Sequence, residues 1–447
     1  MQIKNICCIG AGYVGGPTMA MIALKCPDIK ITVVDHNSER IDAWNGSLEN
    51  LPIYEPGLSD IVKEVRGENL FFSNDVETSI NLAEIIFMAV NTPTKTEGKG
   101  SGMAADLSNI EACAQTIAKA SKSDKIVVEK STVPIRTAEK IKEILDSNGN
   151  KVNFEILSNP EFLAEGTAVK DLYEPDRVLI GGDETESGEK AVAALVDIYS
   201  NWIPKNKILT TNVWSSELSK LASNAMLAQR VSSINSLSAL CEKTGADIHE
   251  LSKAIGMDHR IGPYFLRASV GFGGSCFKKD ILNLVYLCNY YGLNEVAEYW
   301  HQVVKINDYQ KKRFAQNIID RLGGNLGGQK IAILGWAFKT NTNDSRESPA
   351  IYISSKLLEK GASLKIYDPM VSKDKIFQDL KEIKISKGIS DNLITKQLNQ
   401  VSIFNNMESS IQDSDGVAIL TEWDQFKKYN WELLKQKNIP VFSHMSL

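Results

Sequence analysis

Cysteine is scarce in this chain, with seven residues among 447. Seven cysteines are too few for the disulfide framework that supports small secreted proteins, and the odd number leaves at least one thiol unpaired. Two of them, Cys7 and Cys8, are adjacent in the sequence. We therefore expect free thiols and a reducing compartment.

Long runs of like charge are also missing. The chain has 50 basic and 55 acidic residues and a net charge of −5, which argues against nucleic acid as the main partner. With 43% hydrophobic and 23% charged residues, the composition is typical of a globular protein and excludes disorder, collagen and coiled coil. The length predicts two or three domains.

One stretch, from Asn5 to Leu24, carries no charged residue and is as long as a membrane span. It is interrupted by four glycines and a proline, and only Lys4 precedes it as a basic residue, so it fits neither a membrane helix nor a signal peptide. We interpret it as a buried strand, a glycine-rich turn and a helix. No other stretch is apolar enough to cross a bilayer, so we expect a cytoplasmic protein with no membrane partner.

Short apolar runs alternate with helical patterns over the first 200 residues, which predicts an α/β domain with a parallel sheet and helices on both faces. The expected strands are Ile6–Ile9, Ile31–Val34, Ile85–Val90, Ile126–Glu129, Glu155–Ser158 and Val178–Gly181, and the helical patterns include Asp106–Lys119 and Thr137–Leu145.

The pattern then changes to long helical stretches, Ser215–Thr244 and Leu293–Arg321. The glycine-rich segment 322–328 marks a boundary, after which alternation resumes over Lys330–Leu334, Ser348–Lys360, Leu364–Tyr367, Gly416–Leu420 and Pro440–Phe442. We expect domains at 1–212, 213–322 and 329–447, and the two α/β ends are candidates for related folds.

A dinucleotide-binding motif follows the first strand. The residues are Gly10, Ala11, Gly12, Tyr13, Val14 and Gly15, so the pattern is GxGxxG between a strand and a helix. The three glycines allow a tight turn, close approach of a pyrophosphate, and helix packing. Asp35, 20 residues after Gly15 at the end of the next strand, suits an adenosine ribose and would repel a 2′-phosphate, so the cofactor is expected to be NAD. Arg40 is either a cofactor contact or a solvated surface side chain.

Cys276 follows the glycine-rich run Gly271–Gly274 and precedes an apolar helical pattern. A helix N-terminus and the neighbouring Lys278 and Lys279 favour the thiolate of such a cysteine. Asp280 would lie one turn further on the same face. The alternative is a buried small hydrophobe, which is the interpretation we give to the other six cysteines.

Two further pairs have the four-residue spacing of one helix face, Lys220 with Asn224 and Glu161 with Glu165. For each, a solvated helix surface is a competing interpretation. Ser131 and Thr132 end a strand where ligands of parallel sheets bind.

These motifs, together with Gly335–Lys339, Thr342, Asp344, Arg346 and Ser348–Ala350, resemble those of the UDP-glucose/GDP-mannose dehydrogenase family, and its animal members in particular. The resemblance covers nearly the whole chain. It implies an N-terminal Rossmann NAD-binding domain, a central helical dimerisation domain and a C-terminal Rossmann-like UDP-sugar-binding domain. It also implies the four-electron oxidation of UDP-glucose to UDP-glucuronate with two NAD, through a thiohemiacetal and a thioester on Cys276.

The resemblance also assigns residues. The catalytic ones are Cys276, Lys220, Asp280, Glu161, Thr132 and Asn224, and no metal is expected. The cofactor contacts are Gly10, Ala11, Gly12, Tyr13, Val14, Gly15, Asp35, Arg40, Val90, Asn91, Thr92, Pro93, Thr94, Ser131, Thr132, Glu165, Cys276, Lys279 and Arg346. The substrate contacts are Glu161, Phe162, Leu163, Ala164, Glu165, Lys220, Asn224, Arg260, Arg267, Ala268, Ser269, Val270, Gly271, Phe272, Gly273, Phe277, Phe338 and Lys339.

Arg260 corresponds to an arginine that relatives extend across a subunit interface, so a homo-oligomer is expected, at least a dimer and by analogy a hexamer. Two departures from the family pattern stand out. Position 267 is Arg where animal relatives commonly have Lys. After Phe442 the sequence reads Ser443-His444-Met445-Ser446-Leu447 in place of an Asp-Gly-Arg segment, so we expect one substrate contact and some packing cover to be missing. The alternatives are a dehydrogenase for another nucleotide sugar or an impaired NAD-binding subunit of a hetero-oligomer.

Overall fold

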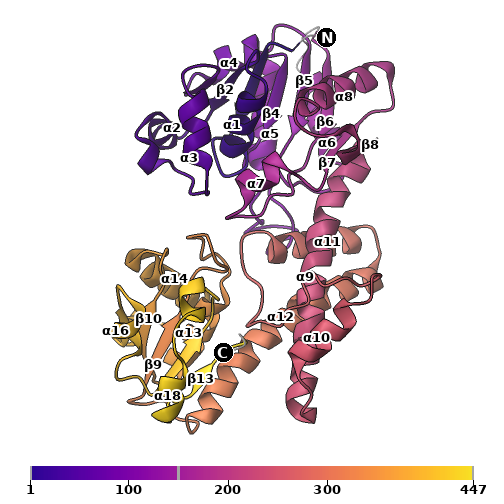
Figure 1. Ribbon diagram of the computed structural model, residues 1–447. Coiled ribbons are helices and arrows are strands. Elements are labelled where there is room, and N and C mark those ends of the chain that lie inside the picture. Colours follow the sequence, from indigo (N-terminus) through magenta and orange to yellow (C-terminus); the bar gives the residue numbers. More distant parts are fainter. Residues whose placement is uncertain (1–2, 148, 150–151, 445–447) are drawn as a thin grey trace. The chain divides into compact units, whose positions relative to one another are not determined.

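The computed structural model describes residues 3–147, 149 and 152–444, and the chain divides into two compact units, Met1–Ser223 and Asn224–Leu447. We describe each unit by itself (Figure 1). In the described residues, no helix is long and apolar enough to cross a membrane. The apolar stretch from Asn5 to Leu24 forms a strand, a turn and a helix, as expected.

The first unit is built on an eight-stranded sheet with the order β3-β2-β1-β4-β5-β6-β7-β8. Its strands are β1 (Asn5–Ile9), β2 (Lys30–Val34), β3 (Leu70–Ser73), β4 (Ile85–Met88), β5 (Lys125–Glu129), β6 (Phe154–Ser158), β7 (Val178–Gly182) and β8 (Ile208–Asn212). Its helices are α1 (Gly15–Lys25), α2 (Ser38–Asn45), α3 (Leu58–Val65), α4 (Val76–Leu82), α5 (Ser108–Ala120), α6 (Thr137–Asp146), α7 (Ala168–Tyr173) and α8 (Glu186–Tyr199), with short 3₁₀ turns at Leu48–Asn50 and Lys205–Lys207.

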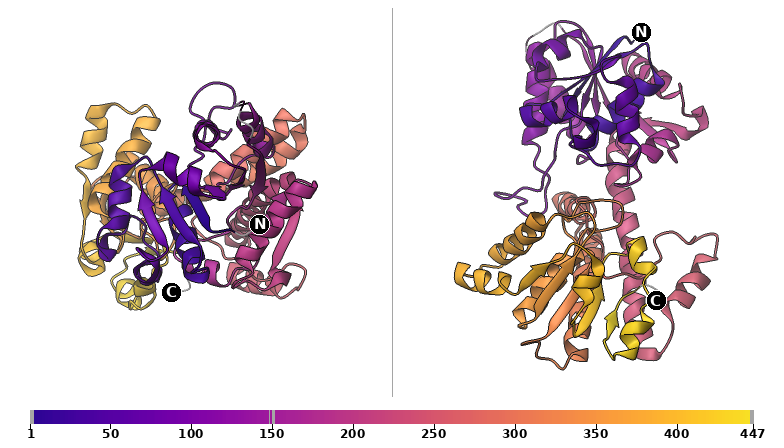
Figure 2. Two further views of the ribbon diagram at one scale, coloured as in Figure 1. Left: turned by 90° about the horizontal axis from the view of Figure 1, so that it is seen from above. Right: turned by 60° about the vertical axis from the view of Figure 1, so that its left-hand side comes forward.

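Helices cover both faces of this sheet, because alternate strand residues point to opposite sides. Cys8 on β1 belongs to the core that contains residues of α1, α3 and α8, whereas Cys7 belongs to the core that contains residues of α5 and α6. The two adjacent cysteines are therefore buried on opposite faces of one strand. The fan of strands between helices is visible in Figure 2.

Two strands of this sheet, β7 and β8, run opposite to the other six and so against the prediction of a parallel sheet. β7 pairs with β6 in antiparallel orientation, while the other neighbouring strands of the sheet are parallel. A strand that reverses direction needs a connection that starts and ends at the same edge. The segment between β6 and β7, which holds Glu161 and Glu165, therefore stays at the carboxyl edge of β6.

Helix α9 (Val213–Thr244) begins in the first unit and continues into the second, followed by α10 (Ile248–Gly256), α11 (Phe277–Tyr290) and α12 (Asn294–Arg321). The second unit also holds a parallel five-stranded sheet formed by β9 (Lys330–Leu334), β10 (Ser363–Tyr367), β11 (Val401–Ile403), β12 (Gly416–Ile419) and β13 (Val441–Phe442). Its helices are α13 (Pro349–Glu359), α14 (Lys373–Ser386), α15 (Asp391–Leu398), α16 (Met407–Ile411), α17 (Asp424–Lys427) and α18 (Glu432–Gln436). Helix α12 contributes Phe314, Ile318 and Ile319 to the core of this sheet.

The two sheets share an order, because β11-β10-β9-β12-β13 repeats the order of β3-β2-β1-β4-β5. In each sheet an aspartate directly follows the second strand in the chain, β2 or β10, and accepts backbone N–H groups from the turn after β1 or β9. Asp35 accepts from Ala11, and Asp368 accepts from Trp336 and Ala337. Asp368 also accepts the N–H groups of Met370 and Val371 and the indole of Trp423, so both of its oxygens are fully engaged. The suggestion that the two ends have related folds agrees with this topology.

Candidate active site

The glycine-rich turn after β1 has the shape that a pyrophosphate needs. Gly10 has a φ of 111°, and an added Cβ there would come within 2.3 Å of the Ala89 carbonyl oxygen. A Cβ on Gly15 would lie 2.0 Å from the Gly10 oxygen, whereas a Cβ on Gly12 would meet nothing within 4 Å. Gly10 thus permits the turn, Gly15 permits close packing, and Gly12 leaves an open space beside the N-terminus of α1.

Asp35 closes this site on the side of β2. Its carboxylate accepts hydrogen bonds from the backbone N–H of Ala11 and of Asn37, each at 2.9 Å, and from Arg40 Nη1, also at 2.9 Å. Burial raises the pKa of Asp35, but these three donors outweigh it and hold the pKa below its usual range. The acid is therefore ionised and able to accept a ribose hydroxyl. Arg40 is a partner of this acid, so it is more than a solvated surface residue.

The predicted cofactor contacts after β4 and β5 lie together. The Thr92 hydroxyl donates to the carbonyl oxygen of Thr132 at 2.8 Å, and the Ser131 hydroxyl donates to that of Val90 at 2.6 Å. The strand β4 ends at Met88, so Val90 lies in the following loop and the expected strand Ile85–Val90 was too long. The carboxyl ends of neighbouring parallel strands bring these loops side by side.

Glu161 and Lys220 form a buried ion pair, with 3.0 Å between Glu161 Oε1 and Lys220 Nζ. The other oxygen, Oε2, accepts the backbone N–H of Leu163 at 2.7 Å. Two cations lie over the Phe162 ring: Lys220 Nζ is 5.5 Å from the ring centre, and the Arg177 guanidinium carbon is 3.8 Å from the ring centre. Of the two competing interpretations, the solvated helix surface is wrong for Lys220, because only 5% of its side chain is exposed.

Glu55 is a residue of this region that sequence reasoning missed. Its buried carboxylate accepts the backbone N–H of Gly166 at 2.5 Å and of Ala168 at 3.1 Å, and it also bonds the hydroxyl of Tyr13. It therefore joins the nucleotide loop to the segment after β6. The only sequence signal was an acid within a proline- and glycine-rich turn, Pro52–Gly57.

In the second unit, Cys276 is the N-cap residue of α11, as the helical pattern predicted. It is the one cysteine among the seven that is partly exposed, and the others are all buried, as expected. Asp280, one turn along, donates its N–H to the Cys276 carbonyl at 2.8 Å and accepts a hydrogen bond from Asn224 Nδ2 at 2.6 Å. Lys279 Nζ lies 3.5 Å from the same carboxylate. Cys276 and Asp280 thus lie one turn apart at the start of α11, and Asn224 is hydrogen-bonded to the acid.

Lys278 differs from its expected role beside the thiol. Its ammonium group pairs with Glu347 at 2.9 Å and lies 3.4 Å from the Tyr352 hydroxyl. The carboxylate of Glu347 therefore balances the charge of Lys278. The pairing also places Glu347 beside the glycine-rich run, where a Cβ on Gly273 would come within 2.7 Å of the Glu347 carbonyl.

The predicted substrate segment before Cys276 is fixed by amide side chains of neighbouring helices. Asn235 on α9 accepts the N–H of Ser269 at 2.8 Å, and Gln310 on α12 donates to the Ser269 carbonyl at 2.5 Å. Asn307 both accepts from and donates to the backbone of Phe272, at 2.8 and 3.0 Å. Ala268, Val270 and Phe272 are buried in this arrangement. The three amides were also missed, because polar residues inside a helical pattern give no local signal of what they hold.

Several predicted contacts pair with carboxylates of their own unit. Arg260 pairs with Asp258 at 2.5 Å, Arg267 with Glu422 at 2.7 Å, and Arg346 with Asp344 at 2.6 Å, while Lys339 Nζ lies 5.6 Å from the Phe338 ring. The Arg346 carbonyl accepts the N–H of Gly274 at 2.8 Å, so it is adjacent to the cysteine loop. The expectation about the end of the chain concerns Met445–Leu447 in part, and these lie outside the described residues.

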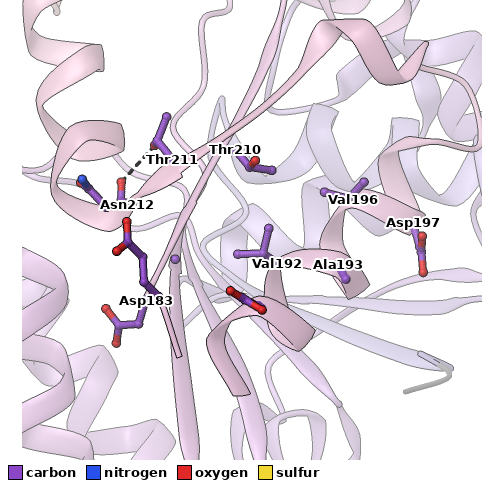
Figure 3. A pocket seen from close by; sticks show the side chains of 11 residues that line it. Asp183, Val192, Ala193, Val196, Asp197, Thr210, Thr211 and Asn212 are labelled. Atoms are coloured by element: carbon purple, nitrogen blue, oxygen red, sulfur yellow. Dashed lines mark hydrogen bonds between the residues drawn. The ribbon is translucent and has the colours of Figure 1, made fainter. Parts of the chain in front are cut away.

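A shallow depression between α8 and β8 is lined by residues such as Asp183, Val192, Asp197 and Thr210 (Figure 3). None of the predicted site residues lines it. Across the part of the chain that the structure covers, no group of three or more His, Cys, Asp or Glu side chains is arranged to hold a metal ion.

The comparisons with known proteins identify the family of the chain. The chain matches three sequence models of one family: the NAD binding domain over residues 4–203, the central domain over 214–309 and the UDP binding domain over 332–443. UDP-glucose 6-dehydrogenase 4 of Oryza sativa subsp. japonica is 58% identical over 431 residues, which cover 96% of this chain and 89% of that protein. UDP-glucose 6-dehydrogenase of Mus musculus is 57% identical over 444 residues, covering 99% and 88%.

Plant and animal relatives therefore match this chain equally well. Among solved structures, a UDP-glucose dehydrogenase from the archaeon Pyrobaculum islandicum has a TM-score of 0.82 at 29% identity and covers 96% of this chain and 92% of its own. The three-domain α/β architecture is the one that the three family models describe, and the first of these models is an NAD-binding domain. The chain belongs to the UDP-glucose/GDP-mannose dehydrogenase family of NAD-dependent oxidoreductases.

Proposed function

We propose that this chain oxidises the C6 primary alcohol of UDP-glucose to a carboxylate and so forms UDP-glucuronate. The observation that carries the proposal is the group around Cys276: one partly exposed thiol at a helix N-terminus, one turn from Asp280, with Asn224 bonded to that acid. The UDP-glucose 6-dehydrogenases at 57–58% identity support this substrate over other nucleotide sugars. They also do not favour the impaired subunit that we considered as an alternative.

The first unit fits the NAD that this family uses. The open space at Gly12 leaves room for a pyrophosphate, the N-terminus of α1 offers N–H groups to it, and ionised Asp35 suits a ribose. When bound, NAD accepts a hydride in each of two oxidations. The residues after β4 and β5, Val90–Thr94 and Ser131–Thr132, are proposed to line the nicotinamide half, with Glu165, Lys279 and Arg346 as further contacts.

We propose that the chain's residues divide the four-electron oxidation into separate steps. The first oxidation converts the C6 alcohol into an aldehyde. The Cys276 sulfur then bonds to C6 and forms a thiohemiacetal, and Lys220 stabilises the oxygen on which negative charge develops. The second oxidation gives a thioester, and attack by water breaks the C–S bond, releases the carboxylate and returns the thiol.

Proton transfer in these steps is assigned to Glu161, Asp280 and Thr132, and the orientation of the sugar to Asn224. Glu161 acts as acid and base in the hydrolysis of the thioester, Asp280 and Thr132 hold a water molecule, and Asn224 orients the sugar. The segment Arg267–Gly273, with Arg260, Phe277, Phe338 and Lys339, is proposed to hold the UDP-sugar. The domain boundaries 1–212, 213–322 and 329–447 and a cytoplasmic location also stay proposals.

We further propose that the chain forms a homo-oligomer. Large apolar side chains of the second unit are exposed on its helices, among them Met226, Leu240, Tyr290, Tyr299 and Tyr309. Exposed large apolar side chains that gather into a patch mark a subunit interface. Light scattering on the purified chain would return a mass of at least twice 49.4 kDa, whereas a monomeric mass would contradict the proposal.

The experiment that tests the function is the stoichiometry of NADH to UDP-glucose. Two NADH per UDP-glucose, lost in Cys276→Ala, would support the proposal. One NADH would mean that the reaction stops at the aldehyde and that the thioester step is wrong. A folded chain that binds NAD but forms no NADH with UDP-glucose, while oxidising another nucleotide sugar, would overturn the proposed substrate.

A further inference from the structure

Lys130 is a buried ammonium group that the proposed mechanism does not use. Lys130 follows β5 directly and is 4% exposed. Its Nζ donates to Asn159 Oδ1 at 3.0 Å and to the Tyr199 hydroxyl at 3.4 Å. Both partners are neutral. Within the described residues, no carboxylate lies within ion-pair distance of it. A lysine is almost never buried without a charged partner, so its position requires an explanation.

The partner Asn159 is fixed by four hydrogen bonds. Its backbone N–H donates to the Glu129 carbonyl at 2.9 Å, and its Nδ2 donates to the Leu179 carbonyl at 2.8 Å. Its Oδ1 accepts from the Tyr199 hydroxyl at 2.7 Å as well as from Lys130. This pattern leaves one orientation for the amide, because a flipped amide would face Lys130 with its own donor.

The position of Asn159 determines the backbone position of Glu161. Only Pro160 separates the two residues, and the proline ring restricts φ at that position. The chain therefore leaves Asn159 in a fixed direction, at the carboxyl edge of β6. Glu161 then reaches Lys220 at 3.0 Å and the N–H of Leu163 at 2.7 Å. Lys130 thus holds the residue from which the proposed acid–base group extends.

The charges around Lys130 act in the same direction. The groups that face it are Glu161 from the segment after β6, Lys220 from α9 and Cys8 from β1, and Glu161 has the largest charge effect of these. Burial lowers the pKa of Lys130 to about 8, and the carboxylate of Glu161 opposes this fall. The ammonium groups of Lys220, which contacts Glu161, and of Lys130, which acts from farther away, therefore both attract the Glu161 carboxylate.

We propose that Lys130 is a positioning residue for the hydrolytic step: through Asn159 and through its charge, it fixes the Glu161 carboxylate that activates water at the thioester. This inference rests on the proposed function, in which Glu161 has that role. It predicts that neutral substitutions of Lys130 slow the release of product and leave the preceding formation of NADH largely intact.

The test uses the full chain with UDP-glucose and NAD. In Lys130→Met, we expect a rapid burst of two NADH per active site, a steady-state kcat lower by about a hundredfold, and a KM for UDP-glucose within about threefold of wild type. Intact-mass spectrometry should then find the sugar nucleotide bonded to Cys276. Glu161→Gln should accumulate the same adduct, and Lys130→Arg, which keeps a charged donor, should restore most of the rate.

Lys125, the first residue of β5, provides a matched control. It too is buried, and its Nζ donates to the carbonyl groups of Asn81 at 2.9 Å and Ala83 at 2.6 Å, at the opposite end of β5. Lys125→Met should lower the thermal midpoint and accumulate no adduct. Accumulation in Lys130→Met alone therefore separates positioning from a general loss of stability.

Each contrary outcome has a distinct meaning. If Glu161→Gln accumulates the adduct and Lys130→Met does not, the role of Lys130 is wrong while the proposed function stands. If neither accumulates it, although the wild type forms two NADH, the role of Glu161 fails and the inference about Lys130 fails with it. Lys130→Gln is the second neutral variant, and if both neutral variants fail to fold, Lys130 serves the fold alone and the proposal is overturned.

Discussion

The carboxylate of Glu161 lies 3.0 Å from the ammonium group of Lys220, and the two side chains are 10% and 5% exposed. A pair so poorly solvated gains from its mutual attraction only while both partners are present, because each charge alone would pay the cost of desolvation. Removal of one partner should therefore destabilise the fold more than removal of both.

Lys220→Met should lower the free energy of unfolding by about 3 kcal/mol, since it leaves the Glu161 carboxylate buried without its contact partner. The double variant Lys220→Met/Glu161→Gln should recover at least about 1 kcal/mol of this loss. Denaturant unfolding of the four proteins in the cycle measures both values. Additive losses would show that the two charges do not stabilise each other.

A buried pair of two acids, Glu129 and Glu217, predicts a dependence of stability on pH. Glu217 accepts the backbone N–H groups of Arg136 and Ala138, whereas neither carboxylate oxygen of Glu129 meets a hydrogen-bond donor among the described residues. Burial, reinforced by Glu217, raises the pKa of Glu129 well above its ordinary value, and burial raises that of Glu217 to about 7. We infer that the two carboxyl groups share a proton.

Acids with raised pKa values stabilise the fold below their unfolded pKa, and this contribution is lost as the pH rises through the folded pKa. The free energy of unfolding should therefore fall by roughly 1–3 kcal/mol between pH 5 and pH 8. Glu129→Gln, whose amide can donate to Glu217, should flatten this slope. Glu139→Gln on α6, where the carboxylate is half exposed, is the control and should leave the slope unchanged.

Gly12 and Gly10 offer a matched pair for the cofactor site. Gly12→Ala places a methyl group in open space, so the protein should fold normally, yet its affinity for NAD should fall at least about tenfold because that space is where the pyrophosphate approaches. Gly10→Ala should instead destabilise the fold, because its φ is 111° and its Cβ would meet the Ala89 carbonyl. Calorimetric titration with NAD alone, beside thermal unfolding, distinguishes the two effects. Unchanged affinity in Gly12→Ala would contradict the assigned site.

The thiols should differ sharply in reactivity. Burial raises the pKa of Cys26 to about 11 and of Cys113 to about 12, and it also raises the pKa values of Cys7, Cys8 and Cys288. Brief treatment of the native protein with iodoacetamide should therefore add one group per chain, on Cys276, as peptide mass spectrometry can locate. Cys276→Ala should take up none. Rapid modification of a buried cysteine would contradict this account of the cores.

Glu55→Gln tests the residue that the motifs did not reveal. A glutamine has one acceptor oxygen in place of two, so its amide N–H₂ would face a backbone donor, and the free energy of unfolding should fall by about 2 kcal/mol. Tyr13→Phe removes a single donor and leaves those of Gly166 and Ala168 in place, so it should cost about 1 kcal/mol. Chemical denaturation measures both. Equal stability of Glu55→Gln and wild type would mean that the carboxylate does not hold the segment after β6.

Much of the architecture could be predicted from the sequence because its signals are local. The β1 turn, Asp35, the helix that follows Cys276 and the strand Lys330–Leu334 each have a pattern within about ten residues. Three strands were missed, β3, β8 and β11, and the last of these has only three residues. β3 has only four residues, and β8 carries exposed threonines and an asparagine in place of an apolar run.

The rest of the site depends on contacts between distant parts of the chain. Glu55 meets Gly166 across 111 positions, and Asn307 meets Phe272 across 35. No spacing rule indicates such pairs. The reversed orientation of β7 is of the same kind, because strand direction depends on where the connection ends and not on the strand's own residues.

The saturation of Asp368 has a consequence for ligand binding by the second sheet. The two sheets have one strand order and an acid at the same corner, yet five N–H groups bond to Asp368, while Asp35 accepts three donors beside an open glycine turn. The acid of the second sheet is therefore structural, whereas the acid of the first sheet has open space beside it. To place a second dinucleotide at the sheet of the second unit, a protein engineer would first have to remove the hydrogen bonds that Trp336 and Trp423 donate to Asp368.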